Sequence, residues 1–132
     1  MSDRRRRFAA GLALVAGIHS LLVGAAMLLA PGLLLRLGGW EPFDDVFFVL
    51  QGGAFHVVLG LGYLLEWRFC GRLCLLILAK ACAVVFLAGV LVLADAPPAV
   101  RLALPGDALF LAAAFALDPR PGRGGQSRSA SS

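Results

Sequence analysis

The sequence predicts an all-α membrane protein, an antiparallel bundle of four transmembrane helices, and three observations support this fold class. The 132 residues are 60% hydrophobic and only 15% charged, with a mean hydropathy of +0.86. Soluble domains are about 45–50% apolar and about 25% charged. The apolar residues form four blocks close to the roughly 20 residues that cross a bilayer. The charged residues gather mainly between these blocks and at the two ends of the chain.

The four blocks define the predicted domain organisation. A basic N-terminal segment, residues 1–7, precedes the first block, and we expect Pro31 to kink or end that helix, leaving an interfacial turn. A signal peptide also begins this way, but its apolar region is shorter, so we expect a retained helix. Residues 41–45 form an acidic link, and residues 118–132 are expected to be a disordered cytoplasmic tail. The predicted spans are residues 8–35, 46–65, 73–93 and 100–117.

The arginines predict the orientation of these spans. With the N-terminus in the cytoplasm, two arginines, Arg36 and Arg101, lie outside. Nine lie inside: Arg4, Arg5, Arg6, Arg7, Arg68, Arg72, Arg120, Arg123 and Arg128. Cytoplasmic loops carry such an excess of basic residues. We therefore expect both termini in the cytoplasm and a multi-pass protein of the bacterial inner membrane.

Four polar side chains lie inside the predicted spans, where charged groups are costly and usually face the protein interior. Lys80 is the only lysine of the chain, and it shares this setting with Asp107, His19 and His56. At a rise of about 1.5 Å per residue, they fall roughly 10–16 Å from the cytoplasmic ends of their helices. One polar residue from each span is therefore predicted to lie in a common layer near the midplane.

Three interpretations of this layer are open. Lys80 and Asp107 can form a structural ion pair, with the histidines hydrogen-bonded between helices. Alternatively, the layer is a ligand pocket or a path for protons or ions. In the third interpretation, one or more side chains extend to an interface and no layer exists. The candidate residues of a substrate or ion path are His19, Gln51, His56, Tyr63, Lys80 and Asp107, with Gln51 extending the path outward from His56.

Small residues recur at helical spacing in the first two spans. One helix face carries Gly52, His56, Gly60 and Tyr63. A second possible face carries Gly17, Ser20 and Gly24. Small side chains let membrane helices approach closely. Both faces are expected to be packing seams rather than pore linings.

Several chemistries are not expected. No catalytic residue is predicted, because the chain has no hydrolase triad on loops, no zinc-protease motif and no phosphate-binding glycine loop. Nucleic-acid binding is not expected, since no basic face is interleaved with aromatic residues. Cys70 and Cys74 are spaced like metal ligands but have no further ligand nearby, so no metal or cofactor is expected. Axial haem ligation by His19 and His56 is the geometric alternative.

The stretches APGLLLRLGGW at residues 30–40 and LQGGAFHVVLGLGY at residues 50–63 resemble the DoxX-like small integral membrane proteins of bacteria. The resemblance spans roughly residues 11–117. It implies a four-helix bundle in the inner membrane, mostly without an assigned activity, although some relatives are described as membrane partners of redox enzymes, including quinone-linked ones. Lys80, Asp107 and residues 60–63 match recurring features of the group, whereas His19 and His56 do not. The resemblance assigns no catalytic residue.

Three functions follow as expectations. The first is an accessory or partner subunit of a membrane complex, which would bind another membrane protein or a second copy of the chain through its small-residue seams. The second is a small transporter or proton-coupled channel that uses the His56, Lys80 and Asp107 layer and that would require dimerisation. The third is a membrane redox component linked to quinone or haem. In each case the lipid bilayer is the constant partner.

Overall fold

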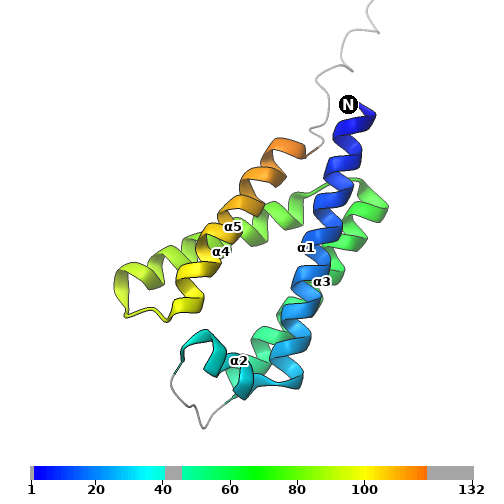
Figure 1. Cartoon of the computed structure of the whole chain (residues 1–132). Helices are drawn as coiled ribbons and strands as arrows, with labels where there is room; N and C mark the ends of the chain where they lie inside the picture. The colour runs from blue at the N-terminus through cyan, green and yellow to red at the C-terminus, as the bar shows by residue number, and fades with distance from the viewer. Residues whose placement is uncertain (1, 41–45, 119–132) are drawn as a thin grey trace, which may run out of the picture.

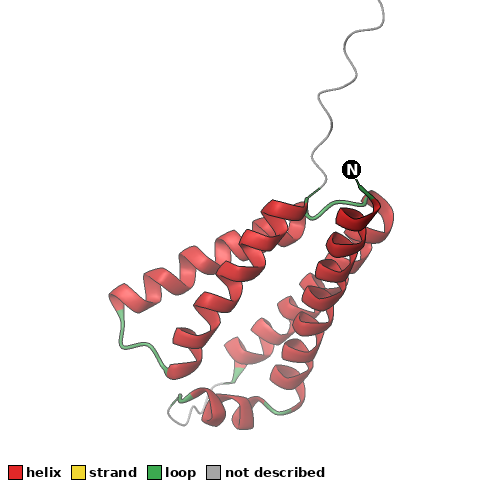
Figure 2. Cartoon of the chain, turned by 45° about the horizontal axis from the view of Figure 1, so that its top comes forward, coloured by secondary structure: helices red, strands yellow, loops and turns green. Residues whose placement is uncertain are grey.

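The computed structural model describes residues 2–40 and 46–118, which form five α-helices and, within these ranges, no β-strand (Figures 1 and 2). Four helices are long and apolar enough to cross a membrane. The predicted all-helical class and the number of apolar spans are therefore confirmed. The acidic link at 41–45 and the tail from residue 119 lie outside the described residues. The helices are α1 (Asp3–Leu29), α2 (Pro31–Gly38), α3 (Phe47–Cys70), α4 (Cys74–Leu93) and α5 (Pro98–Leu117).

Helix α1 begins at Asp3 rather than at Phe8, so the run of arginines is helical. The Ser2 hydroxyl accepts a hydrogen bond from the backbone N–H of Arg5 at 3.4 Å, and Asp3 lies in the first turn. A serine cap followed by an acidic residue is a common helix start, because it satisfies free N–H groups and complements the helix dipole. The sequence analysis treated these residues only as a basic segment.

The first predicted span is divided in two by Pro31. Proline has no N–H to donate within a helix, and it is well tolerated in the first turn of a new one. Accordingly α1 ends at Leu29, and Pro31 opens the separate helix α2. Gly39, with φ of 84°, ends α2 in the left-handed conformation that glycine adopts readily. A short helix therefore stands where an interfacial turn was expected.

The other helices lie close to the predicted spans. Helix α3 continues beyond Leu65 to Cys70, and Gly71, with φ of 62°, then turns the chain into α4. Helix α5 starts at Pro98 and continues through Pro105. A proline inside a helix leaves one carbonyl, here that of Arg101, without its usual partner. The fourth span is thus helical despite the residues that weakened its prediction.

Helices α1 and α3 form one closely packed pair, in which glycines face each other. A Cβ atom placed on Gly24 would lie 2.8 Å from the carbonyl oxygen of Gly53. A Cβ atom on Gly60 would lie 2.9 Å from the carbonyl oxygen of Gly17. The two small-residue faces therefore pack against each other within the chain, with Gly53 in the position that the sequence analysis gave to Gly52.

Helices α4 and α5 form the second pair, and the two pairs approach each other most closely at one end (Figures 1 and 2). We call this the clamped end; it contains the start of α1, the α3–α4 turn and the end of α5. Its apolar core consists mainly of small and leucine side chains. The buried members are Ala9, Ala13, Ala16, Tyr63, Leu73, Leu76 and Ala114. At the other end the two pairs diverge, and there Gly39, after α2, lies against Pro98 at the start of α5.

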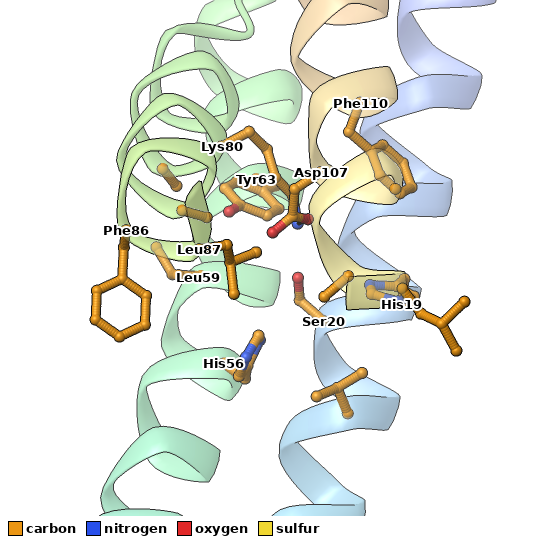
Figure 3. A pocket seen from close by; sticks show the side chains of 16 residues that line it. His19, Ser20, His56, Leu59, Tyr63, Lys80, Phe86, Leu87, Asp107 and Phe110 are labelled. Carbon is orange, nitrogen blue, oxygen red and sulfur yellow. Dashed lines mark hydrogen bonds and ion pairs between the residues drawn. The ribbon is translucent and has the colours of Figure 1, made fainter. Parts of the chain in front are cut away.

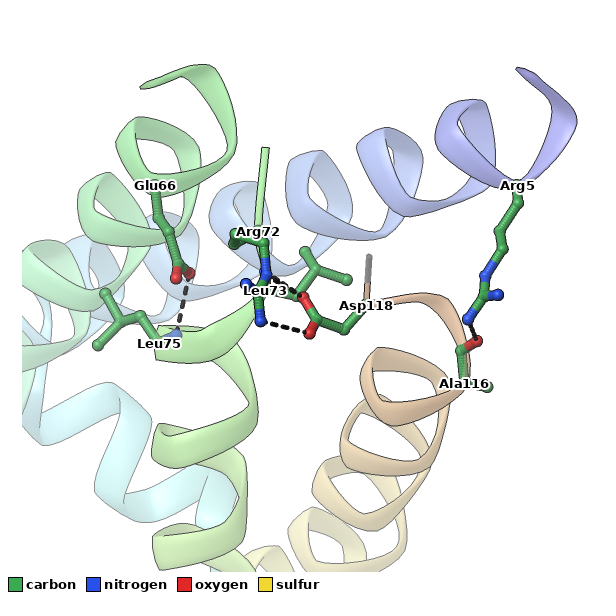
Figure 4. Close-up of polar contacts among 7 residues, drawn as sticks. All are labelled: Arg5, Glu66, Arg72, Leu73, Leu75, Ala116 and Asp118. Atoms are coloured by element: carbon green, nitrogen blue, oxygen red, sulfur yellow. Dashed lines mark hydrogen bonds and ion pairs between the residues drawn. The ribbon is translucent and has the colours of Figure 1, made fainter. Parts of the chain in front are cut away.

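Polar contacts hold the clamped end together (Figure 4). The Asp118 carboxylate accepts a hydrogen bond from the backbone N–H of Leu73 at 3.0 Å and two from the Arg72 guanidinium at 3.0 and 3.2 Å. Glu66 accepts from the backbone N–H of Leu75 at 2.9 Å. The first turn of α4 is therefore capped by carboxylates from α3 and from the residue after α5. The hydrogen bond to Asp118 raises the pKa of Arg72 above its ordinary value.

Candidate functional site

A cavity of about 490 Å³ lies where the two helix pairs diverge, and all four long helices contribute to its lining. Its walls are mainly apolar. Six polar side chains also line it. They are His19 and Ser20 from α1, His56 and Tyr63 from α3, Lys80 from α4 and Asp107 from α5. In Figure 3 Ser20, Lys80 and Asp107 lie close together between the pairs, and His19 lies to one side of them. We call this cavity the central pocket.

Lys80 and Asp107 form an ion pair across α4 and α5. The Lys80 Nζ donates to one carboxylate oxygen of Asp107 at 2.5 Å. The Lys80 side chain is 7% exposed and that of Asp107 is 18% exposed. Each charge is compensated by the other, as an ion pair surrounded by apolar side chains requires. The contact between these two residues, one of the predicted arrangements, is present in the structure.

Phe110 provides a second contact for the ammonium group. The Lys80 Nζ lies 5.3 Å from the centre of the Phe110 ring, within the range of a cation–π interaction. The same ring packs against His19, with ring centres 5.9 Å apart. One turn of α5 separates Asp107 from Phe110, so a single helix face supplies both the carboxylate and the ring. Lys80 is thereby held in one orientation at the pocket wall.

His56 has a buried side-chain nitrogen, Nδ1, that makes no hydrogen bond to the described residues. Leaving a buried polar atom unpaired costs about 1–3 kcal/mol. The His56 side chain faces the central pocket (Figure 3). Within the described residues, the hydrogen-bonding capacity of this nitrogen is therefore unused.

Tyr63 and Ser20 complete the polar part of the pocket. Tyr63 is 2% exposed and Ser20 is 1% exposed. In Figure 3 the Tyr63 ring lies beside the Lys80–Asp107 pair, and the Ser20 hydroxyl points toward the Asp107 side chain. His56 lies farther from the clamped end than these residues. His56 and Tyr63 are seven residues apart on α3, so the polar groups of the pocket extend along about two turns of that helix.

One predicted site residue, Gln51, lies outside the central pocket, and another, His19, lies at its edge. Gln51 is exposed and does not line the central pocket, so the structure shows no polar extension from His56 through it. His19 is also exposed, although one side of its ring faces the pocket and Phe110. Gln51 is five residues before His56, so it lies on a different face of α3 and nearer the start of that helix.

Two further residues, Ser20 and Phe110, line the central pocket and were not predicted as site residues. Ser20 was treated only as part of a packing seam, and Phe110 was not singled out in an apolar run. Phe110 follows Asp107 by three residues, so it shares the helix face of the aspartate. The three-residue spacing from Asp107 is the sequence signal that could have identified Phe110 as a site residue. The partner of the ring, Lys80, is distant in sequence, and no local pattern indicates this contact.

The described residues offer no metal site. Within 2–40 and 46–118, no group of three histidine, cysteine or carboxylate side chains lies close enough to hold a metal ion. Cys70, Cys74 and Cys82 are free and exposed. The chemical capacity of the central pocket therefore lies in hydrogen bonding and charge. It presents an ammonium, a carboxylate, two imidazoles and two hydroxyl groups.

Comparison with known proteins finds no match. No protein-family model, no curated protein and no solved structure is significantly similar to this chain.

Proposed function

We propose that this chain is a four-span membrane protein that binds a small molecule in the central pocket, as a small transporter does. The observation that carries the proposal is the unpaired, buried Nδ1 of His56 in a cavity that also holds the Lys80–Asp107 pair. A purely structural ion pair needs neither a cavity of about 490 Å³ beside it nor further polar groups around that cavity. Charged residues within membrane spans commonly mark such sites.

The distribution of side-chain sizes supports membrane insertion. The buried positions of α1 hold only alanine, glycine and serine. Large apolar side chains lie outside instead; Leu29, Val92 and Leu93 are more than 80% exposed. Water would oppose this arrangement, whereas lipid chains solvate such side chains and small residues favour close helix packing. We therefore place the four long helices antiparallel across a bilayer, with α2 and Trp40 at its surface.

The arginines support an orientation with the clamped end in the cytoplasm. Arg4 to Arg7, Arg68 and Arg72 lie at that end, whereas Arg36 and Arg101 lie at the other. On the resemblance to DoxX-like proteins, we further propose that this membrane is the bacterial inner membrane, with the orientation that the charge bias favours.

Native cysteines make the orientation testable. Cys70 and Cys74 are exposed at the clamped end, so a membrane-impermeant maleimide should label them only after cells are permeabilised. In a background where all three cysteines are serine, Asp95→Cys should label in intact cells, because Asp95 is fully exposed at the opposite end. The reverse pattern would invert the orientation.

The structure weakens the argument for an accessory subunit. That expectation placed the partner on the small-residue seams, but Gly17, Gly24, Gly53 and Gly60 contact one another between α1 and α3. They are not available to a second protein. Purification in mild detergent distinguishes the three expected functions. An accessory subunit would retain a protein partner, a haem protein would retain visible absorbance, and a small transporter would show neither.

A pocket-filling variant tests the proposed function without knowledge of the ligand. A Cβ atom on Gly106, which lines the pocket, would meet no heavy atom within 4 Å, and the same holds for Gly89 on α4 outside the pocket. Gly106→Leu should therefore fill the cavity without a backbone clash, and Gly89→Leu is the matched control. Small molecules are then extracted from each purified protein and compared by mass spectrometry. We expect one species in the wild type and in Gly89→Leu that Gly106→Leu lacks. Identical profiles in all three proteins would refute the proposal.

A further inference from the structure

The central pocket is lined by residues of the four long helices and by none of the described loop residues between them. Its lining residues fall within 19–23 of α1, 56–63 of α3, 79–87 of α4 and 102–110 of α5. The loop residues around Trp40 and Asp95 line a separate cavity. The cavity around Trp40 shares no lining residue with the central pocket.

The rim of the pocket faces the same surroundings as the outer surface of the helices. Phe86 and Leu102 line the pocket, yet they are 68% and 75% exposed. In a bilayer these side chains would contact lipid chains. The polar groups lie deeper: Tyr63 and Lys80 are almost fully buried. The pocket thus combines an apolar, lipid-facing entrance with a polar inner part.

The charges of the inner part restrict the ligand. Lys80 and Asp107 compensate each other, so an added cation or anion would remain uncompensated in an apolar environment, which is costly. An ammonium group has three N–H donors, and Lys80 directs one to Asp107. The second carboxylate oxygen of Asp107 accepts no hydrogen bond from the described residues. A neutral group that both donates and accepts hydrogen bonds can therefore contact both residues.

We infer that the central pocket takes a neutral amphiphile, with a hydroxyl or amide head and an apolar body, which enters from the lipid between α4–α5 and α1–α3. The head contacts Lys80 and Asp107, and a hydrogen-bonding group of the ligand satisfies the Nδ1 of His56. The body occupies the apolar walls formed by side chains such as Leu59, Leu87 and Phe110. This inference rests on the proposed function, and it adds the class of ligand and its route.

A series of probes with one tail length and different heads tests the inference. The purified protein in nanodiscs is heated with octanamide, octanoate, octylammonium or acetamide, and unfolding is followed by the fluorescence of Trp40 and Trp67. A ligand that binds only the folded state raises the melting temperature. At a hundredfold excess over its Kd, octanamide should raise it by several degrees, on the order expected for a single occupied site. Octanoate, octylammonium and the tail-less acetamide should have little effect.

The pocket variants separate binding from general effects of an amphiphile on the nanodisc. Gly89→Leu should respond to octanamide like the wild type, and Gly106→Leu should not respond. Equal stabilisation by either charged probe, or by acetamide, would overturn the ligand class. An equal response of Gly106→Leu would show that octanamide does not act in the pocket. If no probe stabilises the protein but a co-purified molecule still depends on Gly106, the ligand class is wrong and the proposed function stands; if neither effect appears, both fail.

Discussion

The two helix pairs of this protein are held together in different ways. Between α1 and α3, glycines bring the backbones into contact, as with Gly24 against Gly53. Between α4 and α5, side chains make the contact through Lys80 and Asp107, while Gly89 and Gly106 have open space around them. The first pair depends on shape and the second on charge. The same four helices thus combine a close-packed base with a polar wall that can contact a ligand.

The largest expected effect comes from separating the charges of the second pair. Lys80→Ala or Asp107→Ala alone leaves a buried charge without a partner and should lower the free energy of unfolding by about 3–5 kcal/mol. The double variant should recover much of this loss. Unfolding of all three variants in mild detergent provides a double-mutant cycle. Additive losses would show that the two charges are not coupled.

The glycine contacts of the first pair should be next in sensitivity. Gly24→Ala places a Cβ atom against backbone atoms of α3, with the Gly53 oxygen at 2.8 Å and the Val57 nitrogen at 2.9 Å. Overpacking of this kind costs about 1–3 kcal/mol. Gly89→Ala is the control, because its Cβ meets nothing within 4 Å; it should be neutral or stabilising by up to about 1 kcal/mol. Equal unfolding free energies for the two variants would contradict the difference between the pairs.

The cap at the clamped end should contribute less. Asp118→Ala removes the acceptor for the Leu73 N–H and should cost about 1 kcal/mol, as loss of a helix cap does. Asp118→Asn keeps an acceptor and should lose less, and Asp95→Asn, at a fully exposed side chain, should have no measurable effect. The raised pKa of Arg72 means that its contribution is complete below its ordinary pKa and is lost only above it. Denaturation between pH 6 and about 9 should therefore show no loss that arises from Arg72.

The smallest expected effect concerns the ring that orients Lys80. Phe110→Leu removes the ring 5.3 Å from Nζ and should cost about 0.5–1 kcal/mol in stability. Phe115→Leu, at a half-exposed ring on the same helix, is the matched control. A role of Phe110 in the site also predicts weaker stabilisation by octanamide in Phe110→Leu than in Phe115→Leu. Equal responses would limit Phe110 to packing.

Much of the fold follows from local sequence signals. Apolar length predicts the four long helices, and glycine or proline explains most of their ends, as Pro31 and Gly71 show. The start of α1 at Asp3 also has a local signal, since Ser2 caps the helix and Asp3 lies in its first turn. By contrast, the cap on α4 comes from Asp118, and no rule of local sequence links Leu73 to a residue at that distance.

The site was less predictable than the fold, for a physical reason. A charge among apolar residues is conspicuous, so Lys80 and Asp107 could be selected from the sequence, and their contact was one of the interpretations. Phe110 and Ser20 are ordinary residues of membrane helices, and only the packing of several helices places them in the central pocket. Gln51 is a polar residue that was selected as a site residue from the sequence but lies on the exposed face of its helix.

The separation of 27 residues between Lys80 and Asp107 also bears on how the chain is made. If α4 entered the bilayer alone, its lysine would have no counter-charge until α5 had been synthesised. Insertion of α4 and α5 together, as one hairpin, avoids this unfavourable intermediate. Both helices of the glycine-packed pair, α1 and α3, precede α4 in the chain and are therefore synthesised before it. Synthesis can therefore proceed in two stages, with a finished pair of helices in the membrane ready to receive the charged hairpin.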